Sequence, residues 1–171
     1  ILVELYDRYV PALVTRTRSS SAKTRKQAVA ELERLGRHGL KPLLEALADE
    51  RDPTQRQIAV SVLGYVGNRG AAAPLVNLAK QESPPPPTGR GLRPLTAQEV
   101  QWDLRIEALV AAGRLADPRT IPDLLQLSKH SEVAMREAAT FALGMTRDRR
   151  AIGPLKNALD DKRQSVQALA C

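Results

Sequence analysis

The sequence predicts an all-α protein, an α-solenoid of stacked helix-turn-helix repeats of about 31 residues each. Three observations predict this fold. The chain matches itself when it is shifted by 31 positions, apolar residues recur within each unit at helical spacing, and aromatic residues are rare. Hydrophobic residues make up 43% of the 171-residue chain but aromatic residues only 3%, and a core of alanine and leucine suits packed helices better than a sheet.

The repeat is found by aligning the chain with itself. Residues 105–113 match residues 136–144 at an offset of 31, whereas the matching step back from Arg105 to Arg56 is 49 residues, one repeat plus 18. Small residues at a fixed position let neighbouring helices approach closely, so the alignment predicts one continuous core. The recurring positions hold Ala28, Ala59, Ala108, Ala139 and Ala170; Leu44, Leu75, Leu124 and Leu155; and Leu47, Leu78, Leu127 and Ala158.

Each unit is predicted to contain two helices joined by a turn. In the last full unit, apolar residues within 135–143 line one helical face and those within 152–159 line another. Gly64, Gly113 and Gly144 fall near the end of the first helix, where a left-handed cap residue is tolerated. We therefore expect these three glycines to lie at or near the ends of their helices.

Helix-start signals divide the chain further. The pairs Asp52–Pro53 and Asp117–Pro118 each combine an acidic N-cap with a proline at the first helical position, and Thr96–Glu99 forms a capping box. The last repeat stops before its Ala-Leu-Gly ending, which favours a fragment of a longer array. The predicted segments are an extra N-terminal helix over 1–21, repeats 1 and 2 over 22–82, a Pro-rich insertion over 83–97, repeats 3 and 4 over 98–161, and a truncated repeat 5 over 162–171.

The Pro-rich insertion interrupts the array. Its segment Ser83–Pro94 contains four consecutive prolines, which exclude a helix and favour an extended polyproline II conformation. One interpretation is a loop that docks onto a partner, with Arg90, Leu92 and Arg93 as candidate contact residues. The other is a tolerated excursion between units, because long surface insertions cost little free energy.

One unit carries a fuller motif than the others. It comprises an apolar residue and Arg, small residues, Ala-Leu-Gly, an Asp-containing turn and an apolar Pro-Leu stretch. It is carried by Met135–Arg136, Ala142–Gly144, Asp148 and Ile152–Leu155, and in an earlier unit by Val62–Gly64 and Ala73–Leu75. This motif resembles HEAT repeats, in particular the short PBS-lyase-like type, and the resemblance implies a helical stack that serves many unrelated roles. The first unit departs from the motif, because Glu33 replaces the glycine.

Charge and cysteine content limit the possible partners and compartments. The formal net charge is +7 and the sequence pI is about 10.0, which favours an acidic partner but is also typical of a soluble protein. The single cysteine, Cys171, excludes an internal disulfide and a Cys-based zinc site and slightly favours a cytoplasmic location. No run approaches the roughly 18 apolar residues that a membrane span requires, so no membrane span is predicted.

Charged residues sort by their position in the unit. Stacking would bring the basic turns inside units to one edge, and the acidic connections between units to the other. The basic edge is a candidate site for phosphate groups or an acidic protein, and the alternative is that these cations only compensate helix C-termini. The turn residues are Arg37, Arg69, Arg119, Arg147, Arg149 and Arg150, and the acids are Asp49, Glu50, Asp52, Glu82, Asp160 and Asp161.

A row of amides is a second candidate surface. Asn77, Gln126 and Asn157 share one position of the second helix, which in HEAT and armadillo families lines the concave face. Amide groups there could donate and accept hydrogen bonds with an extended peptide backbone. Ordinary polar surface is the alternative, because asparagine and glutamine are mostly exposed.

A column of arginines is predicted to be structural. Arg25, Arg56, Arg105 and Arg136 occur at one position, where apolar stems can pack between helices while the guanidinium groups bind carbonyls or acids. Trp102 stands alone in its column, and we expect it to pack against the insertion.

The sequence contains no catalytic or metal-binding constellation. Its two histidines, His38 and His130, fall in different units without suitably spaced acids, and no cofactor is expected. The first prediction is therefore a non-catalytic scaffold that binds another protein as part of a larger protein or complex. Two alternatives stay open. One is a nucleic-acid-binding array that uses the turn arginines, and the other, taken from the name of the resembled repeat, is a bilin lyase-type accessory subunit.

Overall fold

The computed structural model describes residues 9, 12, 16, 19–51, 53–66, 68–81 and 97–170. Within these ranges every regular element is a helix, and none is long and apolar enough to cross a membrane. In chain order they are α2 (Ala22–Ala48), α3 (Pro53–Val66), η1 (Arg69–Ala71), α4 (Ala72–Lys80), α5 (Ala97–Leu115), η2 (Pro118–Thr120), α6 (Ile121–Leu127), α7 (Val133–Thr146), η3 (Arg149–Ala151), α8 (Ile152–Ala158) and α9 (Gln164–Ala170).

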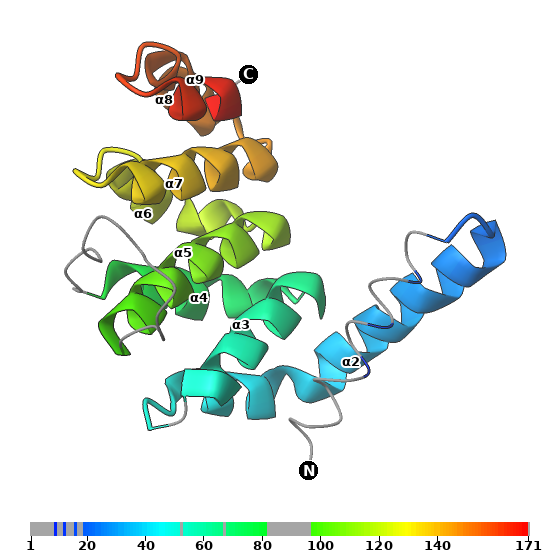
Figure 1. The fold of residues 1–171 in the computed structure, drawn as a ribbon. Coiled ribbons are helices and arrows are strands. Elements are labelled where there is room, and N and C mark those ends of the chain that lie inside the picture. Colours follow the sequence, from blue (N-terminus) through cyan, green and yellow to red (C-terminus); the bar gives the residue numbers. More distant parts are fainter. Residues whose placement is uncertain are drawn as a thin grey trace.

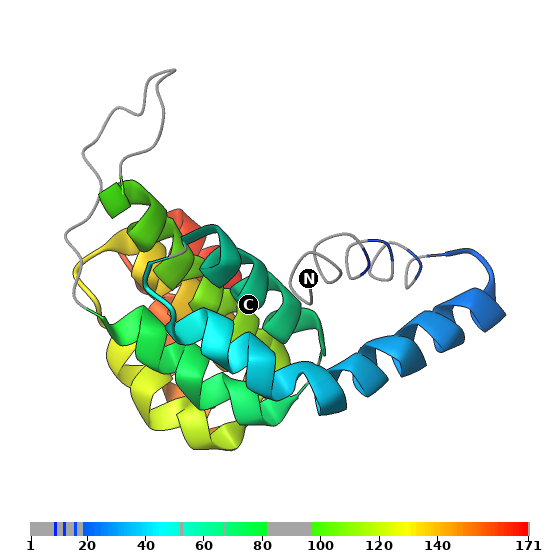
Figure 2. The same cartoon turned by 90° about the horizontal axis from the view of Figure 1, so that it is seen from below.

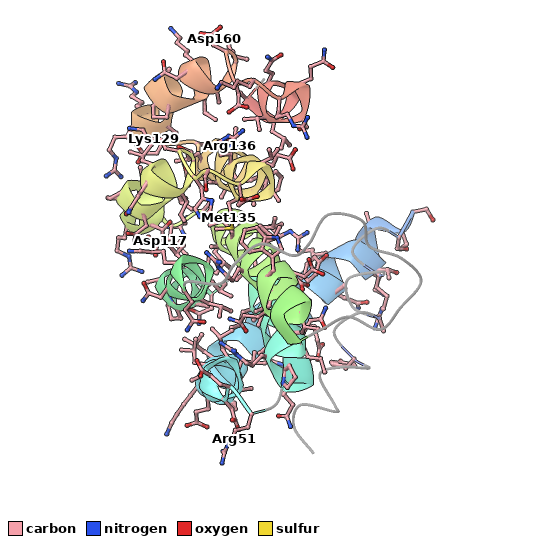
Figure 3. All side chains as sticks on the ribbon, turned by 60° about the vertical axis from the view of Figure 1, so that its left-hand side comes forward. Arg51, Asp117, Lys129, Met135, Arg136 and Asp160 are labelled. Atoms are coloured by element: carbon pink, nitrogen blue, oxygen red, sulfur yellow. The ribbon has the colours of Figure 1, made fainter. Side chains whose placement is uncertain are left out.

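The helices form two stacked layers. In the first layer α3 packs on α5, α5 on α7, and α7 on α9 (Figure 1). The second layer contains the C-terminal part of α2 together with α4, α6 and α8, and it is seen beside the first in Figure 3. The 3₁₀ turns η1, η2 and η3 connect the two helices of each unit. This arrangement is the predicted all-α solenoid.

The predicted columns of small and branched residues form the core between these layers. Ala59, Ala108 and Ala139 are fully buried in the first layer, and Leu75 and Leu124 are fully buried in the second. Burying one leucine side chain contributes about 1.5–3 kcal/mol relative to leaving it in water. The repeated positions therefore hold neighbouring units together, and they do so without the large aromatic residues that the chain lacks.

The column glycines lie inside helices and allow two helices to touch. A Cβ on Gly64 would lie 2.7 Å from the Cβ of Ala111 in α5, and a Cβ on Gly113 would lie 2.6 Å from the Cα of Ala142 in α7. Real Cβ atoms essentially never approach another heavy atom this closely. The prediction that these glycines lie at or near the ends of their helices is confirmed, because α3, α5 and α7 each end two residues later. The glycines are not themselves the left-handed caps, and Gly64 and Gly113 serve close packing instead.

Left-handed cap residues do occur, but three positions later. Ala116 and Arg147 have φ angles of 49° and 52°. Their N–H groups donate to the carbonyls of Gly113 and Gly144 at 3.1 and 3.3 Å. Helices α5 and α7 thus end at non-glycine residues in the left-handed region, a conformation that is uncommon outside glycine, asparagine and aspartate.

The first unit lacks the predicted turn, because α2 is continuous over Ala22–Ala48. Arg37 occupies the position that holds Asn68, Asp117 and Asp148 in the later units. In those units the side-chain oxygen accepts the N–H two residues ahead and starts the next 3₁₀ turn. Arginine has no acceptor oxygen, so no side chain at this position starts a 3₁₀ turn, and α2 continues through Gly36, Gly39 and Pro42.

Only the C-terminal part of α2 belongs to the stack. Its N-terminal half extends away from α3 to α9 (Figures 1 and 2), although Ala28 there is buried and Glu31 accepts a hydrogen bond from the hydroxyl of Tyr9 at 3.0 Å. In the C-terminal part Leu43, Ala46 and Leu47 are buried. Of the predicted N-terminal helix over 1–21, residues 9, 12 and 16 are described and are helical, whereas residues 19–21 are described and are not helical. The Pro-rich insertion lies outside the described residues up to Ala97, where α5 begins.

Candidate functional site

The arginine column caps the ends of the second-layer helices. The Nε of Arg56 donates to the carbonyl of Leu47 at 3.0 Å, and the Nε of Arg105 donates to the carbonyl of Ala79 at 2.9 Å. Both carbonyls belong to the last turn of a helix, where no intrahelical N–H is available. Both arginines are buried. The predicted structural role is therefore confirmed at these positions.

Arg136 occupies the same position and binds an acid as well. Its Nε lies 2.9 Å from a carboxylate oxygen of Asp161, and its Nη1 donates to the carbonyls of His130 and Ser131 at 3.0 and 2.8 Å. This contact holds the pKa of Asp161 below its usual range. Figure 3 shows Arg136 between the two layers. The side chain of Arg25, the first member of the column, lies outside the described part.

Trp102 is a core residue in α5. It is buried, and the guanidinium carbon of Arg105 lies 5.1 Å from its ring centroid. Because burial disfavours the charged form, it lowers the pKa of Arg105. The expected contact between Trp102 and the insertion lies outside the described residues.

Short Asp-x-Arg pairs build the turns inside the units. In η2, Asp117 accepts the backbone N–H of Arg119 at 3.0 Å and its guanidinium Nη2 at 2.6 Å. In η3, Asp148 accepts the N–H and the Nη2 of Arg150, each at 2.9 Å. Two of the six candidate turn arginines therefore bind an acid of their own turn, and the side chain of Arg37 lies outside the described part.

These carboxylates make the protein sensitive to acid. The hydrogen bond from Arg150 lowers the pKa of Asp148 to about 2, and bonds from Arg119 and Arg136 lower the pKa of Asp117 and Asp161. The pKa of an Asp side chain in the unfolded chain is about 3.9. Between about pH 4 and pH 2 the unfolded chain therefore binds more protons than the folded one. We expect the Tm to fall slightly from pH 7 to pH 5, because burial lowers the pKa of His130 so that the histidine of the unfolded chain binds protons first, and then to fall further as the pH approaches 2.

Thermal melts followed by circular dichroism at each pH test this expectation. The double variant Asp117→Asn/Asp148→Asn serves as the matched control, because it keeps the capping oxygens and removes two of the titrating groups. Its Tm should fall less steeply between pH 4 and pH 2 than that of the wild type. An identical slope would show that these two carboxylates do not carry the acid sensitivity.

Three arginines remain free on what we call the turn edge, which comprises residues 68–71, 116–120 and 147–151. Arg69, Arg147 and Arg149 are exposed, and the side chain of none of them forms a hydrogen bond or ion pair with another described residue. Adjacent turns are in contact, because the Nη2 of Arg150 donates to the carbonyl of Pro118 at 3.0 Å. The turns thus form one edge with uncompensated positive charge.

The connections between units form the opposite edge, which we call the connection edge, and its described part carries acids and bases together. Asp49 forms an ion pair with Arg51 at 3.0 Å, and Asp161 is bonded to Arg136. Exposed cations lie in the same connections, among them Lys129, Lys162 and Arg163. Asp52 and Glu82 lie outside the described residues, so an acidic edge stays a prediction.

An exposed stripe beside the turn edge was not predicted. The guanidinium carbon of Arg114 lies 4.6 Å from the ring centroid of Tyr65, at a distance typical of a cation–π interaction. Tyr65 is 38% exposed and Met145 is 41% exposed. These three residues lie one position after the column glycines of α3, α5 and α7. The self-alignment that revealed the alanine column also places these three residues at one repeat position, so the stripe could have been predicted from it.

Comparison with known families agrees with this architecture. A family model described as HEAT repeats matches residues 10–87 and 90–171, which is nearly the whole chain. The chain belongs to the HEAT-repeat family. HEAT repeats generally serve as protein-interaction scaffolds. No curated protein matches the sequence.

The amide row lies on the second layer of this HEAT array. Asn77, Gln126 and Asn157 are exposed on α4, α6 and α8. The second-layer helices α4 and α6 are joined by an ion pair of 2.7 Å between Lys80 and Asp123. A binding role for the amides stays a prediction. The insertion candidates Arg90, Leu92 and Arg93, like Cys171, lie outside the described residues.

Proposed function

We propose that this HEAT array is a non-catalytic scaffold that binds an acidic protein partner along its turn edge. The observation that carries the proposal is the contrast between two sets of arginines. Arg56, Arg105 and Arg136 are bonded inside the fold, whereas Arg69 and Arg149 face solvent with no partner among the described residues. A free guanidinium offers paired donors that match the two oxygens of a carboxylate.

The stripe beside the turn edge supplies the apolar part of such an interface. Tyr65, Arg114 and Met145 are of the residue types that are enriched in protein–protein interfaces. Their side chains present an aromatic ring, a guanidinium stacked on it and a flexible thioether. An interface with these residues at its centre and arginines around them has the usual anatomy of an apolar core and a charged rim.

Charge reversal on the turn edge tests the proposal. In Arg69→Glu/Arg147→Glu/Arg149→Glu, repulsion replaces attraction at three sites, so the affinity for the partner should fall about 10- to 100-fold, mostly through slower association. The partner is first isolated by quantitative affinity capture with the wild type, and its affinity for both proteins is then measured by surface plasmon resonance.

The matched control is a triple variant that reverses the same number of charges on the connection edge, the edge formed by the connections between units. Arg51→Glu/Lys162→Glu/Arg163→Glu should keep the affinity of the wild type within about threefold, because only the long-range field is altered. Both triple variants should melt as the wild type does, since the substituted side chains are exposed. Equal loss of affinity in the two variants would contradict a specific turn-edge interface.

The same arginines also favour a nucleic-acid partner, which is the second candidate function. The net charge of +7 gives such a partner a long-range attraction. Contacts to three to five phosphates would give a logarithmic salt dependence with a slope of about −3 to −4.5. Fluorescence anisotropy with mixed-sequence duplex DNA and single-stranded RNA distinguishes the two candidates, because absence of binding at low salt removes this one.

A further inference from the structure

A pocket lies between α7, α8 and the connection that follows α6, away from the turn edge. Its volume is about 320 Å³, near the lower end of the range for sites that hold small ligands. Leu143 and Leu155 contribute apolar walls, Thr140 and Ala158 also line it, and Asn157 of the amide row belongs to its lining. No part of the lining comes from α9.

The pocket exists because the repeat is altered at two core positions. Ala158 aligns with Leu78 and Leu127, which are buried in the earlier units, so three carbon atoms of a core side chain are missing here. Thr140 aligns with Val60 and Leu109, which are fully buried, so a hydroxyl replaces an apolar branch. The smaller side chain opens space, and Thr140 is among the residues that line the same pocket.

The Thr140 hydroxyl is a buried group without a hydrogen bond. The residue is 1% exposed, and its Oγ1 has no hydrogen-bond partner among the described residues. An unsatisfied buried hydroxyl costs free energy, and valine would fill the same volume without this cost. Missing volume at Ala158 costs free energy as well. Thr140 and Ala158 line the same pocket, and both differ from the repeat in a way that lowers stability. Such residues are typical of a functional site.

The mouth of the pocket is polar and carries positive charge. Lys129 lines it, is exposed, and forms no ion pair with another described residue. Asn157 presents an amide that can both donate and accept, whereas Arg136 and Asp161 are already bonded to each other. The best fit is a side chain with an aliphatic stem and a hydrogen-bonding end, on a segment whose backbone can reach the Asn157 amide.

We propose that this pocket receives a glutamine-type side chain from an extended segment of a protein partner. The segment would lie along the amide row of α6 and α8, where Gln126 and Asn157 can bind its backbone. The glutamine amide would bind the Thr140 hydroxyl, and its methylene groups would fill the space left by Ala158. This inference rests on the proposed scaffold function but uses a different surface from the turn edge.

Peptide titration followed by NMR of the ¹⁵N-labelled protein tests this site. The probes are the capped pentapeptides acetyl-SSQSS-amide, acetyl-SSLSS-amide and acetyl-SSASS-amide. We expect the glutamine peptide to shift the amide signals of Thr140, Leu143 and Ala158, the leucine peptide to bind about tenfold more weakly, and the alanine peptide not to bind. Absence of these shifts with the glutamine and leucine peptides would overturn the proposal.

Two variants assign the effect to the pocket. Ala158→Leu restores the side chain of the earlier units, so it should abolish binding and raise the Tm by about 2–4 °C. Thr140→Val should make the glutamine and leucine peptides bind equally. If Ala158→Leu binds like the wild type, or lowers the Tm because no space exists for leucine, the pocket is not the site.

The turn-edge triple variant separates this inference from the proposed function. It should bind the glutamine peptide as the wild type does, because Arg69, Arg147 and Arg149 do not line the pocket. Loss of the protein partner on charge reversal together with unchanged peptide binding supports both sites. Peptide binding that requires the turn edge contradicts the pocket assignment and leaves the proposed function standing.

Discussion

Replacing Gly113 by alanine should lower the free energy of unfolding by about 1–2 kcal/mol, although alanine is the better helix former. The added Cβ would lie 2.6 Å from the Cα and 2.9 Å from the Cβ of Ala142. Backbone cannot rotate away as a long side chain can, so α5 and α7 must separate and the core between them must open. Overpacking of this kind typically costs about 1–3 kcal/mol. The higher helix propensity of alanine contributes about 1 kcal/mol in the opposite direction and offsets part of this cost.

The same column supplies the control for this substitution. A Cβ on Gly144 would meet nothing within 4 Å, so Gly144→Ala should raise the free energy of unfolding by about 0.5–1 kcal/mol through helix propensity alone. Urea unfolding followed by circular dichroism measures both variants. If the two alanines change stability in the same direction, close approach of α5 and α7 does not explain the glycine at position 113.

The fold was predictable because it depends on residues that repeat. One self-alignment identified the alanine and leucine columns, the helical period and the arginine position, and the structure places all three as expected in α3 to α8. The self-alignment does not show which atoms face one another. Gly113 was therefore assigned to a helix end, whereas its reason is the backbone of Ala142, which comes from the next unit.

Features that break the repeat were harder to predict. The turn missing from α2 follows from Arg37, a residue with no oxygen to cap a helix, but a repeat pattern favours assuming a turn in every unit. Ala158 was visible as the one alanine among leucines, yet its consequence depends on Thr140, which lies 18 positions earlier. Only the packing of α7 against α8 brings these two positions to one pocket.

The turn edge shows a different limit. Arg119 and Arg150 each lie two positions after an aspartate cap, whereas Arg69 lies only one position after its cap, Asn68. In the structure Arg119 and Arg150 bind the acids of their own turns, whereas Arg69 does not. Arg149 also lies one position after its cap and forms no side-chain bond to it, although this cap is an aspartate. The spacing from the cap therefore distinguishes the paired arginines from the free ones.

Truncation of Arg105 should have the largest effect among the charged residues, lowering the free energy of unfolding by about 3–5 kcal/mol in Arg105→Ala. The side chain is 3% exposed, it donates to the carbonyl of Ala79, and it lies over Trp102. Alanine removes the stem and leaves a cavity between layers, and it also leaves the carbonyl at the end of α4 without a donor. Each loss costs about 1–3 kcal/mol.

Methionine at the same position separates the two contributions. Arg105→Met retains an unbranched stem of similar volume, and it removes a buried charge whose burial is itself unfavourable. The loss should therefore fall to about 1–2 kcal/mol, the cost of the unsatisfied carbonyl of Ala79. Equal losses for alanine and methionine would mean that the hydrogen bond carries the whole effect and the stem none.

An exposed arginine of the turn edge provides the reference for both variants. Arg119 is 76% exposed at its side chain, although it binds the buried Asp117 at 2.6 Å. Arg119→Ala should change the Tm little, because its partner keeps the bond to the backbone N–H of residue 119 and water replaces the guanidinium. A large loss of stability in Arg105→Ala and a small one in Arg119→Ala would show that the buried arginines of the column hold the array together. The exposed arginines of the turn edge would then be available for a partner.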